Sequence, residues 1–264
     1  MCRLLTLVSF LFSLSAMAAI KSETVEYKEG QTTLEGYMAH NPAVRMRQPA
    51  VVIVHAWMGV DDFVKKKTDE MAQMGFVALA ADIYGKGVRP KDAKEAAELA
   101  GKYRNNDRTL LRARAQAAFD LLKKNPKVDP SKIVAIGYCF GGTTVLEMAM
   151  AGLPLAGVVS FHGGLEFPKL ADTKNIKSKL LILHGAVDPY VPPAQVQALT
   201  KALDEAKTDY QFVAYSGAVH SFTDPSAGTD ASKGAAYNPV ADRRSTEAMK
   251  DFFREVVGAP SVQN

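Results

Sequence analysis

The hydrophobic positions of this 264-residue chain form short apolar runs that alternate with amphipathic stretches. A short run rich in Val, Ile and Leu is typical of a strand buried on both faces. Apolar residues spaced three and four apart indicate a helix with one buried face. The expected buried strands are 50–55, 76–81, 133–136, 156–161, 179–184 and 210–215.

Helical patterns lie between these strands and imply a layered fold. The expected helices are 61–74, 90–103, 109–124, 193–205 and 242–257, with one more beginning at Thr143. Strands that alternate with helices at these lengths predict an α/β fold, a mostly parallel sheet with helices on both faces. Two alternating runs, 23–30 and 33–40, predict an N-terminal antiparallel hairpin. No repeat or long linker divides the chain, so we expect one domain over residues 20–264.

The first nineteen residues have the pattern of a signal peptide. Arg3 precedes a nearly all-apolar stretch, 4–14, and residues 16–18 (Ala-Met-Ala) form a small–x–small cleavage site. An uncleaved anchor is the alternative, but the stretch is short for a membrane span. We therefore expect residues 1–19 to be removed. The mature protein is then secreted or periplasmic and has no membrane attachment.

Composition and charge narrow the function further. Hydrophobic residues make up 47% of the chain and charged residues 23%, a globular balance. The formal charge of +4 is spread among interleaved acids and bases, and no aromatic-interleaved basic stripe indicates nucleic-acid binding. No histidine pair has metal-ligand spacing and no glycine-rich phosphate loop occurs. We expect no metal or cofactor, and a monomer or small homo-oligomer.

One cysteine lies at a strand-to-helix turn. Removal of the leader takes away Cys2 and leaves Cys139, in the sequence 137–142 (Gly-Tyr-Cys-Phe-Gly-Gly). This is a glycine–x–nucleophile–x–glycine turn, which holds its central residue in a strained conformation above the sheet. The following helix N-terminus favours a thiolate. The alternative is a buried small hydrophobic residue, but the flanking glycines favour a nucleophile.

The ends of other strands supply an acid, a base and an amide. Asp188 follows strand 179–184, and His220 lies in a loop after strand 210–215. The chain order nucleophile, acid, histidine is that of α/β hydrolases. We expect Cys139 to attack an acyl carbon, His220 to act as base and Asp188 to orient it. The alternatives are a turn-forming aspartate and a structural histidine.

The same strand ends suggest an oxyanion hole and a pocket. The backbone N–H groups of Trp57 and Phe140 are placed to bind a developing oxyanion. His55, His162 and His184 also lie at strand ends but lack a matching partner, which favours structural or pocket-wall roles. The loop 224–239 is expected to lie over the site. The expected pocket residues are Tyr84, Lys86, Tyr138, Phe222 and Asp224.

Four motifs carry a family resemblance: residues 80–85 (AADIYG), 137–142 (GYCFGG), 184–189 (HGAVDP) and 220–222 (HSF). The chain resembles the dienelactone hydrolase family of α/β hydrolases over nearly all of its mature length. The resemblance implies a cofactor-free, single-domain hydrolase with an α/β-hydrolase fold. It also implies the same triad and the same two oxyanion amides.

Departures from the family pattern bear on the substrate. Well-known members carry a glutamate where this chain has Ala56, and an arginine where it has Asp224. Neither Arg89 nor Arg104 is assigned to the family's other substrate arginine. Because an acid, Asp224, takes the place of one arginine that would pair with a carboxylate, we expect a less anionic ester, lactone or thioester substrate. A thioesterase or acyltransferase on the same triad, or a binding protein with a vestigial site, remains an alternative.

Overall fold

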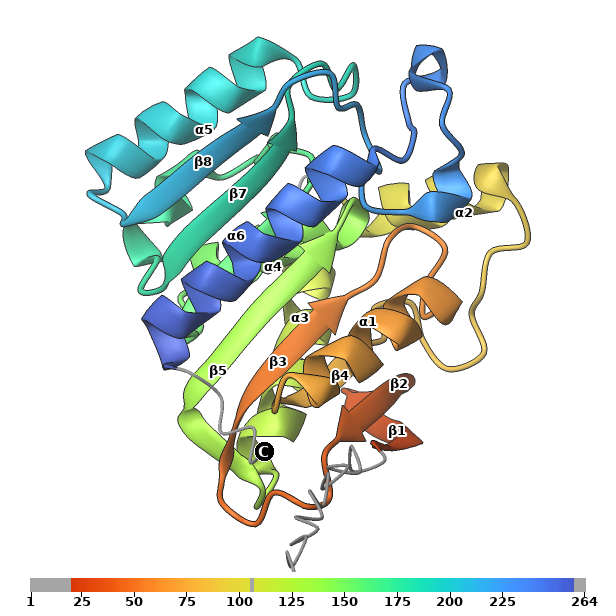
Figure 1. Ribbon diagram of the computed structural model, residues 1–264, viewed down its shortest axis with the longest axis vertical. Coiled ribbons are helices and arrows are strands. Elements are labelled where there is room, and N and C mark those ends of the chain that lie inside the picture. Colours follow the sequence, from red (N-terminus) through yellow and green to blue (C-terminus); the bar gives the residue numbers. More distant parts are fainter. Residues whose placement is uncertain (1–19, 105–106, 259–264) are drawn as a thin grey trace, which may run out of the picture.

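An eight-stranded sheet organises the computed structural model, which describes residues 20–104 and 107–258 (Figure 1). The strand order is β1-β2-β4-β3-β5-β6-β7-β8. Strands β3 to β8 are parallel, while β2 pairs antiparallel with both β1 and β4, so the expected mostly parallel sheet with an N-terminal hairpin is confirmed. The strands are β1 (Lys21–Glu29), β2 (Thr32–His40), β3 (Gln48–Val54), β4 (Val77–Ala81), β5 (Val128–Tyr138), β6 (Gly157–Phe161), β7 (Lys179–Gly185) and β8 (Tyr210–Tyr215).

Helices cover both faces of the sheet, and each face has its own apolar core (Figure 1). Helices α1 (Asp62–Gln73) and α6 (Pro239–Val257) pack on one face, where Phe252 and Phe253 meet β-strand side chains such as Ile136. The other face is covered by α3, α4 and α5. The remaining helical segments are α2 (Ala93–Tyr103), α3 (Thr109–Lys124), α4 (Phe140–Met150), α5 (Pro193–Glu205) and the 3-10 turns η1 (Leu170–Asn175), η2 (Pro225–Ala227) and η3 (Ala231–Lys233).

Three elements begin at least three residues earlier than the sequence predicts. Strand β5 begins at Val128 because its pairing with β3 extends back to Gln48. Helix α4 begins at Phe140, since the turn around Cys139 itself forms the first helical turn. Helix α6 begins at Pro239, where Asn238 caps two backbone N–H groups and proline suits the first helical position. All three corrections lengthen an expected element.

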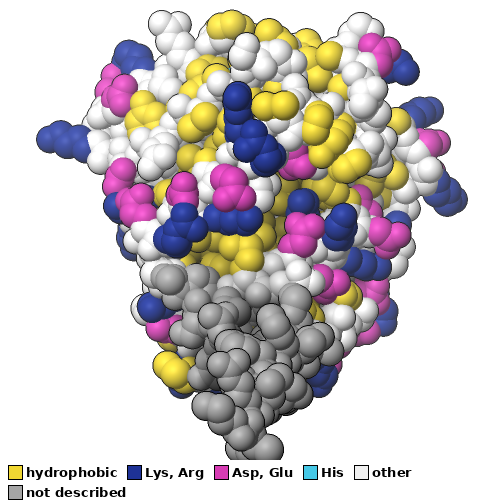
Figure 2. Space-filling view, viewed as in Figure 1, with side chains coloured by type: hydrophobic (Ala, Val, Ile, Leu, Met, Phe, Trp, Pro, Cys, Tyr) yellow, Lys and Arg dark blue, Asp and Glu magenta, His cyan; other side chains and the backbone are white. Residues whose placement is uncertain are grey.

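The surface and the termini add two facts. Figure 2 shows acidic and basic side chains intermixed on one face of the molecule. Within residues 20–104 and 107–258, no helix combines the length and apolar character needed to cross a membrane. The expected signal peptide, residues 1–19, lies outside the described residues.

Candidate active site

Cys139 lies between β5 and α4 in a backbone conformation that a side-chain-bearing residue rarely adopts. Its φ is 55° and its ψ is −112°. Strain of this kind costs about 1–3 kcal/mol and persists only where the surroundings enforce it. Two glycines allow the tight turn: a Cβ on Gly137 would lie 2.0 Å from the Gly141 carbonyl oxygen, and one on Gly141 would lie 2.1 Å from the Val54 carbonyl oxygen. No larger residue fits either position without moving backbone.

Two residues at the end of β6 hold the strained cysteine by accepting a hydrogen bond from the Cys139 backbone N–H. The Cys139 N–H donates to the carbonyl oxygen of Phe161 at 3.0 Å and lies 3.1 Å from Nδ1 of His162. His162 follows Phe161 directly and turns its ring back with a φ of 40°. Two acceptors from consecutive residues thus fix the direction from which the thiol leaves the backbone.

Asp188 and His220 form a hydrogen-bonded pair beside this thiol. His220 Nδ1 lies 2.8 Å from Asp188 Oδ2, and the Asp188 side chain is fully buried. The other Asp188 oxygen accepts from the Tyr190 backbone N–H at 2.9 Å. A buried carboxylate with both oxygens engaged holds the imidazole with its Nε2 free to face a partner.

The backbone of His220 is fixed by the loop that precedes α6. His220 N–H donates to the Gly234 carbonyl oxygen at 3.2 Å, and its carbonyl oxygen accepts from Ala236 N–H at 3.0 Å. This pairing forms an isolated parallel bridge between His220 and Ala235. The loop therefore acts as a short extra strand that supports the histidine.

The ionisation of Cys139 and His220 is coupled. Burial raises the pKa of the Cys139 thiol, but the charge and hydrogen bond of His220, the Phe140 amide and the charge of Arg104 together bring it below its usual value. For His220, burial lowers the pKa, while Cys139 and Asp188 raise it to about 10. The two shifts favour a thiolate beside an imidazolium. Such a pair supplies a nucleophile and a proton donor at neutral pH.

The backbone N–H groups of Phe140 and Trp57 are the two donors expected to bind a developing oxyanion. The Phe140 backbone amide favours the Cys139 thiolate and so helps to lower the pKa of the thiol. Trp57 follows β3, and no backbone carbonyl in the described part of the chain accepts its N–H. Trp57 is 38% exposed at the surface.

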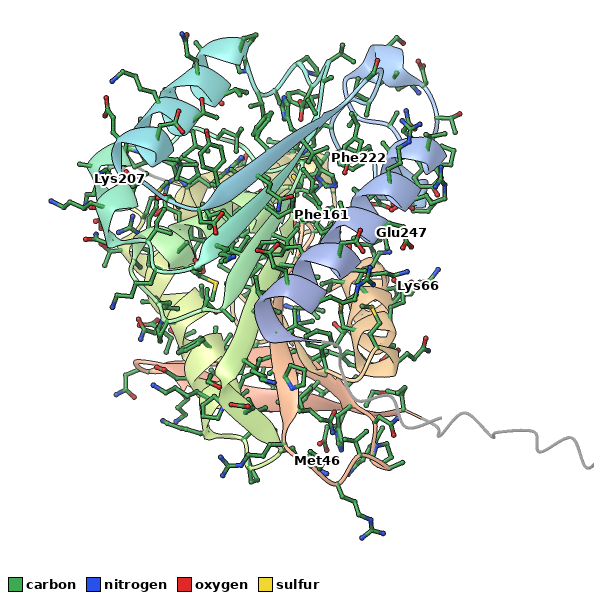
Figure 3. The ribbon with its side chains drawn as sticks, turned by 60° about the vertical axis from the view of Figure 1, so that its left-hand side comes forward. Met46, Lys66, Phe161, Lys207, Phe222 and Glu247 are labelled. Atoms are coloured by element: carbon green, nitrogen blue, oxygen red, sulfur yellow. The ribbon has the colours of Figure 1, made fainter. Side chains whose placement is uncertain are left out.

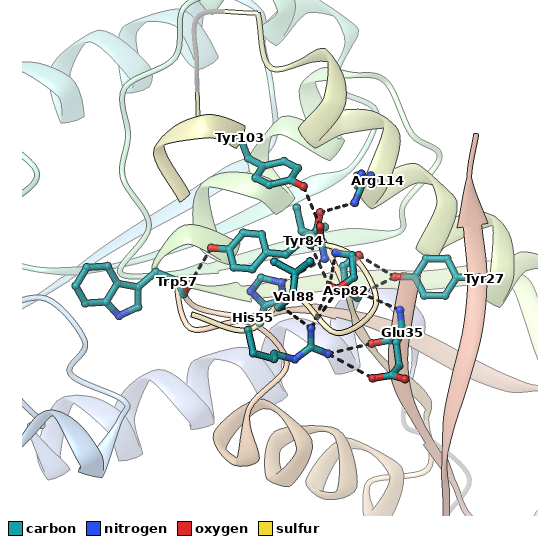
Figure 4. Close-up of polar contacts among 12 residues, drawn as sticks. Tyr27, Glu35, His55, Trp57, Asp82, Tyr84, Val88, Tyr103 and Arg114 are labelled. Atoms are coloured by element: carbon teal, nitrogen blue, oxygen red, sulfur yellow. Dashed lines mark hydrogen bonds and ion pairs between the residues drawn. The ribbon is translucent and has the colours of Figure 1, made fainter. Parts of the chain in front are cut away.

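The Trp57 loop is clamped to the loop after β4 (Figure 4). Tyr84 Oη donates to the Trp57 carbonyl oxygen at 2.9 Å. His55 is fully buried, with Nδ1 2.6 Å from the Ala56 carbonyl oxygen and Nε2 accepting from Ile83 N–H at 3.3 Å. Burial lowers the pKa of His55 to about 4. The neutral ring keeps one donor and one acceptor for these two bonds.

A buried carboxylate anchors the second of these loops. Asp82 Oδ1 accepts from the N–H groups of Tyr84 and Gly85, at 3.0 and 3.1 Å, and Oδ2 accepts from Glu35 N–H at 2.9 Å (Figure 4). Arg89 lies within 3.8 Å of Asp82 and 3.9 Å of Glu35. The position of Tyr84, and through it Trp57, is therefore set by this network.

A polar cavity of about 370 Å³ is connected to the site through Tyr190, although neither Cys139 nor His220 lines it. Tyr190 lines it and meets the His220 ring edge to face, with centroids 5.4 Å apart. Thr143, on the first turn of α4, forms another part of the wall. The full lining is Gly101, Arg104, Arg108, Thr143, Gly164, Glu166, Tyr190 and Gln195.

Comparison with known proteins identifies the family and the fold. The sequence model of the dienelactone hydrolase family matches residues 34–257. The chain belongs to the dienelactone hydrolase family. Its eight-stranded sheet and flanking helices are the α/β-hydrolase fold of that family.

Individual members of the family are similar over most of this chain. A dienelactone hydrolase-like promiscuous phosphotriesterase from metagenomic libraries is 39% identical, with a TM-score of 0.85, covering 90% of this chain and 99% of its own. A putative carboxymethylenebutenolidase of Synechocystis is 25% identical, over 89% of this chain and 97% of its own length. A carboxymethylenebutenolidase of Pseudomonas is 27% identical, over 61% and 68% of the two chains. Membership of the family establishes a hydrolase of the dienelactone hydrolase type.

Three of the expected pocket residues lie elsewhere in this family member. Tyr138 points to the α1 and α6 face, where it stacks on Phe161, because side chains alternate along β5. Phe222 is fully buried between His162 and Tyr215, and Figure 3 shows it inside the molecule. Lys86 is directed to Glu26 on β1, 2.5 Å away. These three expectations are corrected.

The other two expected pocket residues lie near the site in supporting positions. Tyr84 is buried close enough to Cys139 that the thiolate charge, together with burial, raises the pKa of its phenol. Asp224 is half-buried and caps the turn η2 through the Ser226 N–H. The structure brings Cys139, Asp188 and His220 together at the carboxyl ends of the parallel strands β5, β7 and β8.

Sequence reasoning missed several residues that surround the site. His162 was expected to be structural or to line a pocket, without a partner, yet it contacts the nucleophile's amide. Its other contact, Thr223, had no motif to indicate it. Tyr190 lies beyond the strand ends that motif spacing can locate, and Arg104, which the sequence left unassigned, lines the cavity. Among the residues described, no group of three His, Cys, Asp or Glu side chains could hold a metal ion.

Proposed function

We propose that this protein cleaves a small carboxylic ester, lactone or related acyl bond by acyl transfer to Cys139. The observation that carries the proposal is Cys139 on its strained turn beside His220, which lowers the pKa of the thiol and is itself held at 2.8 Å by the buried Asp188. In a buried structural cysteine, desolvation raises the thiol pKa and no neighbouring charge lowers it again. The family membership supports the same reaction class.

The proposed reaction has two steps. The Cys139 thiolate attacks the acyl carbon, a C–S bond forms, and the oxyanion accepts hydrogen bonds from the Phe140 and Trp57 amides. The C–O bond then breaks and His220 donates its proton to the leaving oxygen. In the second step His220 takes a proton from water, which attacks the thioester and releases the acid and the thiolate.

We propose a neutral or weakly charged substrate. Lys86 is engaged by Glu26, and Asp224 replaces an arginine of the family pattern beside the His220 loop. Arg108 lines the cavity but faces Glu147 at 3.3 Å, which offsets its charge. Arg104 is exposed and adds one positive charge to the cavity wall.

A substrate panel tests both parts of this proposal. Turnover of neutral aryl esters, neutral lactones and an anionic dienelactone is compared in the native protein and in Cys139→Ala. We expect neutral esters to be preferred and all turnover to disappear in Cys139→Ala. A neutral phosphotriester is included in the panel because the metagenomic relative is described as a promiscuous phosphotriesterase. Much faster turnover of the dienelactone contradicts the substrate proposal, and turnover by Cys139→Ala contradicts the mechanism.

Two alternatives use the same site and are separated by simple measurements. A thioesterase or acyltransferase hydrolyses thioesters faster than oxygen esters, or transfers the acyl group to an added alcohol or amine. If the protein only binds its ligand, the native protein and Cys139→Ala bind ester analogues equally well, and neither protein turns an ester over. Product analysis and calorimetry on the same two proteins distinguish all three.

We further propose that the protein is exported, on the signal-peptide pattern of residues 1–19. Expression of the full chain followed by cell fractionation and N-terminal sequencing tests this. We expect an exported product that begins near Ala19 or Ile20. An intact N-terminus in the cytoplasmic fraction contradicts it.

A further inference from the structure

A buried histidine links the nucleophile to the loop that carries its base. His162 Nδ1 lies 3.1 Å from the Cys139 backbone nitrogen, and its Nε2 lies 2.8 Å from Thr223 Oγ1. Thr223 is three residues after His220 and is itself buried. One ring therefore contacts both the turn that carries Cys139 and the loop that carries His220.

The hydrogen-bonding pattern fixes the tautomer of this ring. Because the Cys139 N–H is a donor, Nδ1 must carry a lone pair, and the hydrogen of a neutral ring then lies on Nε2. Nε2–H donates to Thr223 Oγ1. Burial and the neighbouring charge of His220 both lower the pKa of His162 well below its usual value, so the ring keeps this form.

Packing around the ring leaves it little freedom. The His162 ring meets His220 edge to face with centroids 5.2 Å apart, and Phe222 in the same way at 5.0 Å. The neighbouring Gly163 approaches the first turn of α4 so closely that a Cβ there would lie 2.9 Å from the Thr143 nitrogen. A ring enclosed in this manner transmits a displacement of one segment to the other.

We propose that His162, through Thr223, is a positioning residue that sets the geometry between Cys139 and His220. It holds the strained Cys139 backbone from one side and the His220 loop from the other. Its two hydrogen bonds go to a backbone N–H and to a hydroxyl, and neither goes to the Cys139 sulfur or to the His220 ring. This inference rests on the proposed function only in taking Cys139 and His220 as the reacting pair.

The test is a double-mutant cycle on His162→Phe and Thr223→Val. Its first measurement is the pH titration of the thiolate absorbance near 240 nm, which needs no substrate. We expect each single variant to raise the Cys139 pKa toward that of an ordinary thiol. Neutral-ester kcat falls roughly 10- to 100-fold in His162→Phe, the loss expected for a small misplacement, while KM changes little. Thr223→Val has little additional effect in the His162→Phe background.

Conservative and remote variants separate positioning from general destabilisation. His162→Asn keeps an acceptor for the Cys139 N–H and should recover part of the lost kcat. His40→Phe and Thr68→Val remove matched buried residues that lie on β2 and α1; they should lower Tm without moving the thiol pKa. If His162→Phe does not fold, Thr223→Val alone decides through the same titration.

An unchanged thiol pKa in folded His162→Phe or Thr223→Val overturns the inference, as does strict additivity of the two effects. Failure of the proposed function looks different. In that case the thiol titration still responds to these variants, but no ester is turned over by the native protein.

Discussion

The phenol of Tyr84 donates a hydrogen bond to the carbonyl oxygen of Trp57 over 2.9 Å. That carbonyl belongs to Trp57, whose N–H is the second proposed oxyanion donor, so the bond holds the loop that supplies this donor. Tyr84 is held in turn by Asp82, which accepts its backbone N–H at 3.0 Å. The oxyanion geometry therefore depends on β4 as well as on β3 and β5.

Removing this phenol oxygen should weaken transition-state binding alone. Tyr84→Phe is expected to lower kcat roughly 5- to 50-fold with little change in KM, because one oxyanion donor contributes at most about 3–4 kcal/mol and here it is displaced, not deleted. Steady-state kinetics on a neutral aryl ester measure the effect. The control is Tyr210→Phe, which removes a bond to Asp204 at the surface of β8. Equal losses in both variants would contradict the assigned role.

Asp188 should control the charge of His220. In Asp188→Asn the hydrogen bond and charge that raise the His220 pKa are lost, and the amide can present its N–H to Nδ1 and favour the wrong tautomer. We expect kcat/KM to fall roughly 10³- to 10⁴-fold, with the fold intact. NMR titration should find the His220 pKa lowered from about 10. A near-native kcat/KM in Asp188→Asn would contradict the role of Asp188 in orienting His220.

The pH dependence of alkylation should follow from the two coupled shifts. The Cys139 pKa is lowered, so the thiolate persists below the usual thiol range, and the iodoacetamide rate should fall only as the pH drops through this lowered value. Without His220 the largest remaining influence is burial, which raises the pKa. His220→Ala should therefore move the midpoint above that of a free thiol. A single rise near pH 8.5 in the native protein, the ordinary thiol value, contradicts the ion pair.

The turn glycines should be intolerant of substitution. A Cβ on Gly141 would lie 2.1 Å from the Val54 carbonyl oxygen, so Gly141→Ala must displace β3 or α4. We expect a loss in unfolding free energy of more than about 4 kcal/mol, or no soluble protein. Gly101→Ala in helix α2 is the matched control, since nothing lies within 4 Å of its added Cβ. Urea denaturation should find that control unchanged or more stable by about 0.4–1 kcal/mol.

The sequence located the parts of the site that depend on chain order and strand ends. The positions of Cys139, Asp188 and His220 follow from the rule that carboxyl ends of parallel strands share one edge. Strand alternation explains one wrong expectation: Tyr138 is two residues after Ile136 and shares its face, so it points away from the thiol. That signal was present in the sequence.

Other contacts leave no trace in a single sequence. The loop before α6 supports His220 through backbone atoms of Gly234 and Ala236, and backbone pairing does not depend on side-chain identity. The partners of His162 are likewise a backbone amide and the hydroxyl of Thr223, brought together only by folding. Arg104 reaches the cavity wall from the end of α2, which no motif positions.

The most direct test of the central claim is detection of the acyl intermediate. The protein is mixed with an activated neutral ester, quenched in acid within milliseconds and measured by intact-protein and peptide mass spectrometry. We predict one added acyl group, on the peptide that contains Cys139, which disappears as turnover ends and is absent from Cys139→Ala. Steady turnover with no adduct on Cys139, or an adduct on another residue, would contradict the account.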